Sequence, residues 1–369
     1  MSERVLITGG AGFIGRRVTE NLLRRGYRVR ILDSFVEQVH GPRRTLPDAL
    51  ADVEAIPGDV RDEDALRKAL AGIDSVLHLA AEVGVGQSMY AIERYVSAND
   101  LGTAALLERL AHKPVRRVVV ASSMSVYGEG LYIDRDGNPV EDAERSNAVS
   151  LSWDPVDASG APMIPAATPE WKRPNLASVY ALTKFVQEQM TLTVTAAYGM
   201  EGVALRLFNV YGPGQALSNP YTGVLAIFAS RLANGKPPLV FEDGRQRRDF
   251  VHVDDVAEAF ALALEHPKAA GKIYNIGSGQ DRSVLQVAEM LAAAMNKAEI
   301  APEVSGKGRK GDVRHCFADT SKAEKELGFV ARQDFTQGLA ALAEWAAGQQ
   351  AHDRIAEARS ELEKRGLVA

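Results

Sequence analysis

The strongest structural signal in this sequence is Arg4-Val-Leu-Ile-Thr-Gly-Gly-Ala-Gly-Phe-Ile-Gly15. Its first residues are an apolar run typical of a short buried strand, and a helical pattern follows the glycines to about Arg25. A second strand is predicted over residues 28–32 and ends at Asp33. A strand, a glycine-rich turn, a helix and a second strand in this order predict the βαβ unit that opens a dinucleotide-binding fold.

The glycines of this stretch have separate expected tasks. Gly9 permits a tight turn, Gly12 lets the main chain approach a pyrophosphate, and Gly15 lets the helix pack closely on the strand. The pyrophosphate then lies at the N-terminus of the helix. Asp33 comes 18 residues after Gly15 (33 − 15), close to the spacing of a carboxylate that binds the adenosine ribose. Because no arginine follows Asp33 directly to receive a 2′-phosphate, we expect NAD rather than NADP.

Strands and helices continue to alternate after this unit. Further strands are predicted over residues 53–56, 75–79, 117–121 and 203–207, with helices over 62–71, 89–112 and 180–198. This alternation predicts a parallel sheet covered by helices, with ligands at the carboxyl ends of its strands. The predicted fold class is therefore α/β, a Rossmann-type doubly wound parallel sheet with a smaller mixed α/β C-terminal substrate domain.

The change in character after Leu207 indicates the domain boundary. Turn-rich sequence follows it, and then come shorter elements and two basic loops. We predict an NAD-binding domain over residues 1–207, with residues 250–277 returning to it. Residues 208–369 are expected mainly to form the substrate domain.

Small or polar residues follow several predicted strands. Asp59 and Val60 follow the third strand, at a position suited to an adenine, and Ala80 and Ala81 allow the main chain to pass close to a cofactor. Ser123, just past the fifth strand, is expected to face the cofactor. The candidate cofactor-binding residues are Gly9, Gly12, Phe13, Ile14, Gly15, Asp33, Asp59, Val60, Leu79, Ala80, Ala81, Asn99, Ser122, Tyr180 and Lys184.

Tyr180 and Lys184 form a candidate catalytic pair. Residues four apart share one face of a helix, so the Lys184 ammonium is expected to lie near the Tyr180 phenol. A free phenol has a pKa of about 10, and a nearby cation lowers that pKa toward the range useful for proton transfer. Taken alone, the pair is more often part of an amphipathic helix with a half-buried tyrosine and a solvated lysine.

The segment between Gly128 and Tyr180 is the least regular part of the sequence. It carries many Gly, Pro, Asp and Ser residues together with Trp153 and Trp171, and it contains no catalytic motif. A loop of this length is usually functional or flexible. A lid over the substrate and a plain surface insertion are equally consistent with it.

Charge and composition exclude several classes of protein. A formal net charge of −5 argues against a nucleic-acid-binding surface, and no apolar run approaches the ~18 residues of a membrane span. The single cysteine, Cys316, fits a reducing compartment, and the N-terminus lacks a secretory pattern. A cytoplasmic protein is expected. His252, His315 and Cys316 have no recognisable metal-ligand spacing, so we predict no metal.

Together these motifs resemble the extended short-chain dehydrogenases/reductases. The three glycines, Ser123, Tyr180 with Lys184, and Arg248-Asp-Phe occur in the order of the NAD-dependent nucleotide-sugar epimerase/dehydratase branch, over roughly residues 3–330. Three shorter stretches resemble the nucleotide-hexose 4-epimerases, the dTDP-L-rhamnose 4-epimerases among them. They are Gly84-Val-Gly-Gln-Ser-Met-Tyr90, Ala216-Leu-Ser-Asn-Pro-Tyr-Thr-Gly223 and Gly311-Asp-Val-Arg-His-Cys-Phe317.

The resemblance implies an activity and roles for its residues. Tyr180 would take the proton from the C4 hydroxyl of a dTDP- or UDP-hexose while NAD takes the hydride. The 4-keto sugar would then rotate inside the pocket before the hydride returns to its opposite face. Lys184 would hold the nicotinamide ribose and keep Tyr180 acidic, and Ser123 would bind the reacting oxygen. The cofactor would stay bound throughout.

The resemblance also implies a substrate site and an assembly. Arg248 and Arg309 match positions that bind the diphosphate, Asn209 matches a substrate-contacting amide, and Asp312 is placed to reach the nucleoside ribose. The neighbouring Arg245 and Arg247 are read as a solvated turn. A homodimer would pair through the helices at about 89–112 and 180–198.

Other activities remain open at this point. The 4,6-dehydratases place Asp-Glu directly after the Ser/Thr, whereas Met124-Ser125 stand here, and the same absence weakens a decarboxylase. A 4-ketoreductase needs only Ser123, Tyr180 and Lys184, but it usually prefers NADPH. A non-catalytic dinucleotide-binding protein would be expected to lack the tyrosine or the lysine.

Overall fold

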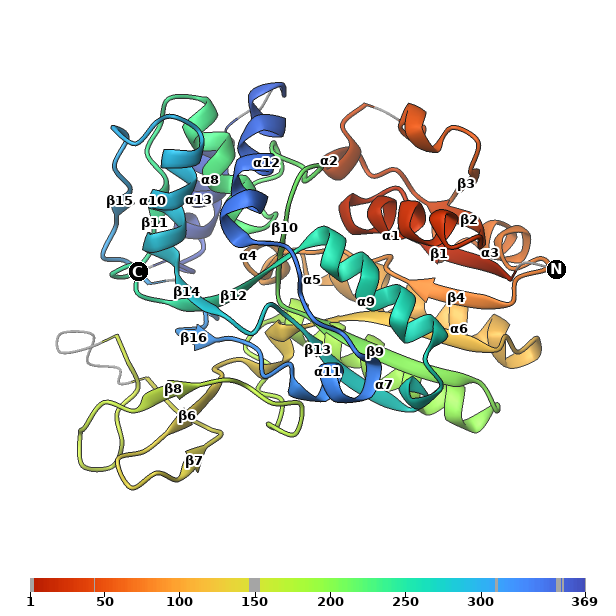
Figure 1. Ribbon diagram of the computed structural model, residues 1–369, viewed down its shortest axis with the longest axis horizontal. Coiled ribbons are helices and arrows are strands. Elements are labelled where there is room, and N and C mark those ends of the chain that lie inside the picture. Colours follow the sequence, from red (N-terminus) through yellow and green to blue (C-terminus); the bar gives the residue numbers. More distant parts are fainter. Residues whose placement is uncertain are drawn as a thin grey trace.

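The computed structural model describes residues 3–42, 44–145, 153–308, 311–349, 353 and 355–368. Its centre is a parallel sheet with the order β3-β2-β1-β4-β5-β9-β13 (Figure 1). The strands predicted up to residue 207 are all present, with ends that shift by at most two residues. The seven strands are β1 (Arg4–Thr8), β2 (Arg28–Asp33), β3 (Glu54–Pro57), β4 (Ser75–His78), β5 (Arg117–Ser123), β9 (Glu201–Leu207) and β13 (Lys272–Ile276).

Helices cover both faces of this sheet because alternate strand residues point to opposite sides. In β1, Val5 and Ile7 belong to one apolar core cluster, and Leu6 belongs to another. The first cluster includes residues of α1 (Phe13–Arg24), α9 (Val253–Glu265) and α11 (Ser321–Leu327). The second is packed by residues of α3 (Glu63–Ala69), α6 (Gly102–His112) and α7 (Val179–Ala197). The fold is therefore doubly wound, as predicted.

The helix predicted over 89–112 begins at Ile92 and is not a regular α-helix throughout. It begins as α5 (Ile92–Tyr95), widens into the π-helical segment η2 (Val96–Leu101) and continues as α6. Wide turns of this kind often occur at functional sites. Here the widened turn contains Asn99, whose side chain bonds to Glu82 and Thr183. These tertiary bonds favour the irregular turn, and periodicity alone does not reveal them.

The described residues between 129 and 175 contain a small antiparallel sheet that projects from the body of the protein (Figure 1). The strands are β6 (Leu131–Ile133), β7 (Pro139–Val140) and β8 (Ile164–Ala166), in the order β7-β6-β8. The described part of this segment is therefore a structured insertion. Other short elements are α2 (Glu37–His40), η1 (Asp48–Leu50), α4 (Val85–Ser88), η3 (Met124–Tyr127) and η4 (Pro267–Ala269).

The C-terminal part has its own apolar core. Residues of α8 (Val224–Ala233), α10 (Val284–Ala294) and α12 (Phe335–Ala347) form it together with β12 (Arg247–His252). Asn219–Gly223 form turns, and α8 begins after them at Val224. The remaining elements are β10 (Asn209–Tyr211), β11 (Leu239–Val240), β14 (Asp281–Ser283), β15 (Glu303–Val304), β16 (His315–Cys316) and α13 (Ile355–Lys364). Within the described residues no helix combines the length and apolar character needed to cross a bilayer.

Candidate active site

The carboxyl ends of β1, β2, β4, β5 and β9 meet around a cavity of about 420 Å³, here called the sheet-edge cavity. This is the edge at which parallel α/β sheets bind ligands. With the exception of Asn99, the cofactor and catalytic residues predicted from the sequence line this cavity together. They are Gly9, Gly12, Phe13, Ile14, Gly15, Asp33, Asp59, Val60, Leu79, Ala80, Ala81, Ser122, Ser123, Tyr180 and Lys184.

The glycine turn at the floor of the cavity has no room for larger residues. Gly9 has a φ of +70°, and a Cβ there would lie 2.8 Å from the main-chain nitrogen of Ala80. A Cβ on Gly15 would lie 2.5 Å from the carbonyl oxygen of Gly9. Gly12 caps the N-terminus of α1 with extended backbone. The turn thus presents bare main chain at a helix N-terminus, which suits the pyrophosphate of a dinucleotide.

Two carboxylates stand at the ends of neighbouring strands. Asp33, at the end of β2, accepts the main-chain N–H groups of Ala11 and Phe35, both at 2.9 Å. These bonds fix its carboxylate on the cavity wall, where it can meet a ribose diol. The Asp59 carboxylate, beyond β3, bonds to the Arg61 guanidinium at 2.6 Å, and this pairing lowers its pKa. The glycine turn and the Asp33 carboxylate of this lining therefore fit the pyrophosphate and the ribose of an adenosine dinucleotide.

The Asn99 side chain lies behind the cavity wall. Its Oδ1 accepts the main-chain N–H of Glu82 at 2.7 Å, and its Nδ2 donates to the Thr183 hydroxyl at 2.9 Å. Glu82 does line the sheet-edge cavity. Asn99 thus holds a lining segment in place, and direct contact of its side chain with the cofactor stays a prediction.

Ser123, Tyr180 and Lys184 come together from β5 and α7. Ser178 caps α7 by accepting the N–H of Ala181 at 3.1 Å. The N–H of Tyr180 donates to the Ser88 hydroxyl of α4 at 3.0 Å. These bonds set the start of α7 so that its first turn faces the end of β5. Tyr180 and Ser123 are close enough to share a side-chain hydrogen bond.

The electrostatics of this trio differ from the sequence expectation. Burial raises the pKa of Tyr180, and the hydrogen bond with Ser123 opposes only part of that rise. Burial also lowers the pKa of Lys184 to about 7. The expected lowering of the Tyr180 pKa by Lys184 is therefore wrong for the protein without its cofactor. The reason is that burial of the phenol dominates its pKa, while the Lys184 ammonium donates its hydrogen bond to Gln187 at 2.7 Å.

Sequence reasoning missed the polar residues that support Lys184. The Gln187 amide accepts from Lys184 and donates to Thr103 at 2.8 Å. The His78 ring bridges Thr8 at 2.7 Å and Thr103 at 2.8 Å. Burial lowers the pKa of His78 to about 3, so its ring is neutral. The one available signal was the spacing of Gln187, three residues after Lys184 on the same helix.

A second cavity, of about 290 Å³, adjoins the first and is here called the C-terminal cavity. The two cavities share Asn209 and residues 221–224. The predicted substrate residues Asn209, Arg248 and Asp312 line it, whereas Arg309 lies outside the described residues. Residues directly beside the catalytic set also line it, namely Met124, Ser125, Ala177 and Ser178.

The Arg248 guanidinium is already engaged by main-chain oxygens. It donates to the carbonyls of Arg247 and Arg314, both at 2.9 Å, and to that of Val313. The Asp312 carboxylate lies 4.0 Å away. Arg248 therefore orders the loop that contains Asp312, in addition to facing the cavity.

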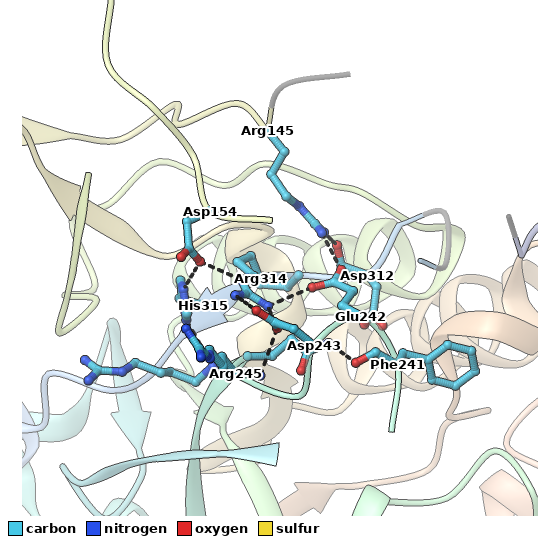
Figure 2. Close-up of polar contacts among 12 residues, drawn as sticks. Arg145, Asp154, Phe241, Glu242, Asp243, Arg245, Asp312, Arg314 and His315 are labelled. Atoms are coloured by element: carbon cyan, nitrogen blue, oxygen red, sulfur yellow. Dashed lines mark hydrogen bonds and ion pairs between the residues drawn. The ribbon is translucent and has the colours of Figure 1, made fainter. Parts of the chain in front are cut away.

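A charged cluster behind this loop joins the insertion to the C-terminal domain (Figure 2). The buried Arg314 guanidinium meets Asp154, Glu242 and Asp243 at 2.6–3.0 Å. Arg145 of the insertion meets Glu242 at 2.5 Å and donates to the Asp312 carbonyl.

The described residues of the insertion contact the loop that contains Asp312 without lining either cavity. His315 Nε2 lies 2.9 Å from Asp154 of the insertion, and His315 Nδ1 accepts the main-chain N–H of Arg247. None of the described residues from 129 to 175 belongs to the lining of either cavity. The charged cluster is thus one connection between the insertion and the loop that carries Asp312, and the main-chain bond from Gly130 to His315 is another.

The doubly wound sheet, the glycine turn and the Ser123–Tyr180–Lys184 set at one cavity define an NAD-binding enzyme of the short-chain dehydrogenase/reductase class. Comparison with known families places it further. The family described as "NAD dependent epimerase/dehydratase family" matches residues 5–277, and the chain belongs to it.

Individual relatives carry related activities. A dTDP-L-rhamnose 4-epimerase of Burkholderia thailandensis is 37% identical, over 94% of this chain and 95% of that protein. A dTDP-glucose 4,6-dehydratase of an Actinoplanes species is 32% identical, over 93% and 97%. The solved UDP-glucose 4-epimerase of Thermus thermophilus in complex with NAD is 31% identical, with a TM-score of 0.73 over 94% of this chain and 100% of that one. The protein is an NAD-dependent enzyme of this family.

Proposed function

We propose that the enzyme is a nucleotide-sugar 4-epimerase that inverts C4 of a dTDP- or UDP-hexose through a transient 4-keto sugar. The 4-epimerases among its relatives support this reading. So do the two adjoining cavities, because one fits the dinucleotide and the other leads from the catalytic residues to Arg248 and Asp312.

Each catalytic side chain has one task in this proposal. Tyr180 removes the proton from the C4 hydroxyl and returns it to the same oxygen once the hydride is back on C4, on the opposite face. Ser123 donates a hydrogen bond to the reacting oxygen, and Lys184 holds the ribose next to Tyr180. Bound NAD supplies the hydride acceptor at C4. Burial favours the protonated phenol at Tyr180, and the hydrogen bond with Ser123 opposes this effect by lowering the pKa.

The observation that carries the proposal is the pair of residues beside Ser123. Met124 and Ser125 both line the C-terminal cavity, at the positions where the resembling 4,6-dehydratases place an aspartate and a glutamate. A dehydratase must move a proton at C5 and release water at C6, which needs a titratable acid and base. Neither a thioether nor a serine hydroxyl supplies these at neutral pH. An epimerase needs neither group.

Substrate binding follows from the lining of the C-terminal cavity. Arg248 faces this cavity with a guanidinium suited to phosphate oxygens. Asn209 lies where the two cavities join, so it is placed to contact the sugar. We assign Arg248 and Arg309 to the diphosphate and Asp312 to the nucleoside ribose.

A homodimer through α5, η2, α6 and α7 belongs to the same proposal. Ile92, Leu101 and Leu182 expose 51%, 58% and 45% of their surfaces there. Exposed apolar side chains gathered on neighbouring helices are typical of an interface. Sedimentation analysis of the full chain would test this assembly.

Proton NMR in heavy water tests the activity. The purified enzyme, without added nicotinamide, is mixed separately with dTDP-L-rhamnose and UDP-glucose. Inversion at C4 changes the H4 coupling, and return of the same hydride leaves C4 free of deuterium. This result would identify a 4-epimerase with resident NAD and also name the nucleotide.

Two other outcomes would contradict the proposal. A 4-keto product with deuterium at C6 would mean a dehydratase, despite Met124 and Ser125. Conversion only after addition of NADPH and a keto sugar would mean a 4-ketoreductase.

A further inference from the structure

One wall of the C-terminal cavity comes from α13, far outside the residues that the family match covers. Ile355, Ala358, Arg359 and Leu362 of this helix line the cavity, whereas the family match ends at residue 277. Ala358 and Leu362 are buried. The helix is therefore part of the binding cavity and not a solvated tail.

Contacts at both ends hold α13 against the cavity. Asp353 accepts the N–H of Ile355 at 3.1 Å and pairs with Lys236 at 2.9 Å. At the other end the Arg365 guanidinium lies 4.8 Å from the centre of the Tyr90 ring. These contacts tie the helix to the neighbourhood of α8 on one side and of α4 on the other.

Among the described residues that line the C-terminal cavity, the cationic side chains are Arg248 and Arg359. A nucleoside diphosphate brings two or more negative charges that require N–H groups pointing at them. The Arg248 guanidinium already donates to three main-chain carbonyls. Asp312, on the same wall, adds a negative charge. Arg248 alone is therefore poorly provided to hold a diphosphate.

Arg359 has more donors available than Arg248. Its Nε donates to Glu363 at 2.8 Å, one turn further along α13. In the described part of the chain its two terminal nitrogens donate to no protein group, and 30% of its side chain is exposed. A planar guanidinium with two terminal nitrogens available matches the oxygens of a phosphate.

We infer that Arg359 binds the diphosphate of the substrate from the wall of the C-terminal cavity that α13 forms. This inference rests on the proposed function, because it takes the C-terminal cavity to be the nucleotide-sugar site. Glu363 keeps the guanidinium oriented through Nε while the terminal nitrogens face the phosphates. Arg359 would then determine affinity for the substrate and take no part in the chemistry at C4.

Calorimetric titration of the full-length enzyme with its NAD tests this role. The probes are UDP and dTDP, each compared with its nucleoside, uridine or thymidine. Arg359→Ala should bind UDP or dTDP about 10-fold or more weakly, the loss typical of a hydrogen bond to a charged group. Binding of the nucleosides should not change. Arg359→Lys, which keeps the charge without the planar fork, should lose less than Arg359→Ala.

Two further variants separate a binding role from a structural one. Lys364→Ala removes a positive charge from the exposed side of the same helix and should leave all four affinities unchanged. Arg359→Gln keeps the stem of the side chain and should reproduce the loss seen with alanine, so it decides the matter if Arg359→Ala does not fold. NAD content and thermal unfolding verify each variant.

The outcomes distinguish a failure of the role inferred for Arg359 from a failure of the proposed function. Normal diphosphate binding by Arg359→Gln overturns the inference alone, and so does an equal loss for diphosphate and nucleoside. If the unmodified enzyme binds neither UDP nor dTDP, the proposed function fails and the role of Arg359 fails with it.

Discussion

The two cavities of this enzyme are built in different ways. The sheet-edge cavity takes its walls from short stretches at the ends of adjacent strands, such as 12–16, 79–83 and 121–123. The C-terminal cavity draws its lining from segments scattered between Gly84 and Leu362. The first is fixed largely by the topology of one sheet, whereas the second is built from loops and the C-terminal helix α13.

The largest expected effect concerns Tyr180, which lines the sheet-edge cavity. Tyr180→Phe removes the proton acceptor and should lower turnover by about 1,000-fold or more, within the range of general acid–base catalysis. NAD content should not change, because the ring and the backbone bond to Ser88 remain. Turnover of dTDP-L-rhamnose or UDP-glucose, followed by NMR, measures the first effect, and absorbance of the released cofactor measures the second.

Tyr198→Phe is the matched control for this prediction. It makes the same change at the C-terminal end of α7, where Tyr198 is 53% exposed. Full activity of Tyr180→Phe would show that Tyr180 is not the proton acceptor and would contradict its catalytic assignment.

The same difference explains what the sequence could predict. The glycine turn, Asp33 and the strand ends were predictable because a strand, its turn and its helix are consecutive in the chain. Tyr180 and Lys184 were recognisable because four residues make one helical turn. All of them lie at the sheet-edge cavity.

Tertiary contacts decided the features that the sequence did not reveal. The π-helical turn at Asn99 depends on Glu82 and Thr183, and the raised pKa of Tyr180 depends on burial. The place of Arg359 depends on how α13 returns to the cavity. No local pattern around these residues encodes the partner that fixes them.

The second prediction tests whether the sheet-edge cavity tolerates any change of its turn. Gly15→Ala places a Cβ against the Gly9 carbonyl and the Gly10 Cα, both main-chain atoms. We expect a loss of about 1–3 kcal/mol in the free energy of unfolding and reduced NAD content. Gly348→Ala is the control, since its Cβ would meet only the Trp345 carbonyl at an ordinary 3.6 Å. Equal NAD content and stability in both variants would contradict the close packing of this turn.

The third prediction probes the C-terminal cavity. Arg248→Ala should raise KM about 10-fold and leave NAD content unchanged, because Arg248 lines this cavity and not the other. Arg245→Ala, an exposed arginine of the same basic segment, should behave like the unmodified enzyme. Initial-rate kinetics separate KM from kcat. A fall in NAD content for Arg248→Ala would show that the two cavities depend on one another.

The smallest expected effect concerns Lys184, whose pKa burial lowers to about 7. Above this value the folded protein without NAD has lost the proton, while the unfolded chain keeps it up to its ordinary pKa of about 10.4. The unfolded state therefore binds more protons, and stability must rise with pH in this window. Relative to Lys184→Met, the unmodified protein should gain about 1 kcal/mol between pH 7 and 8. Denaturant unfolding of enzyme stripped of NAD, at both pH values, measures this gain, with Lys364→Met as the exposed control that shows none. If the Lys184 difference is also flat, the ammonium is solvated, and burial does not lower the pKa of the catalytic lysine.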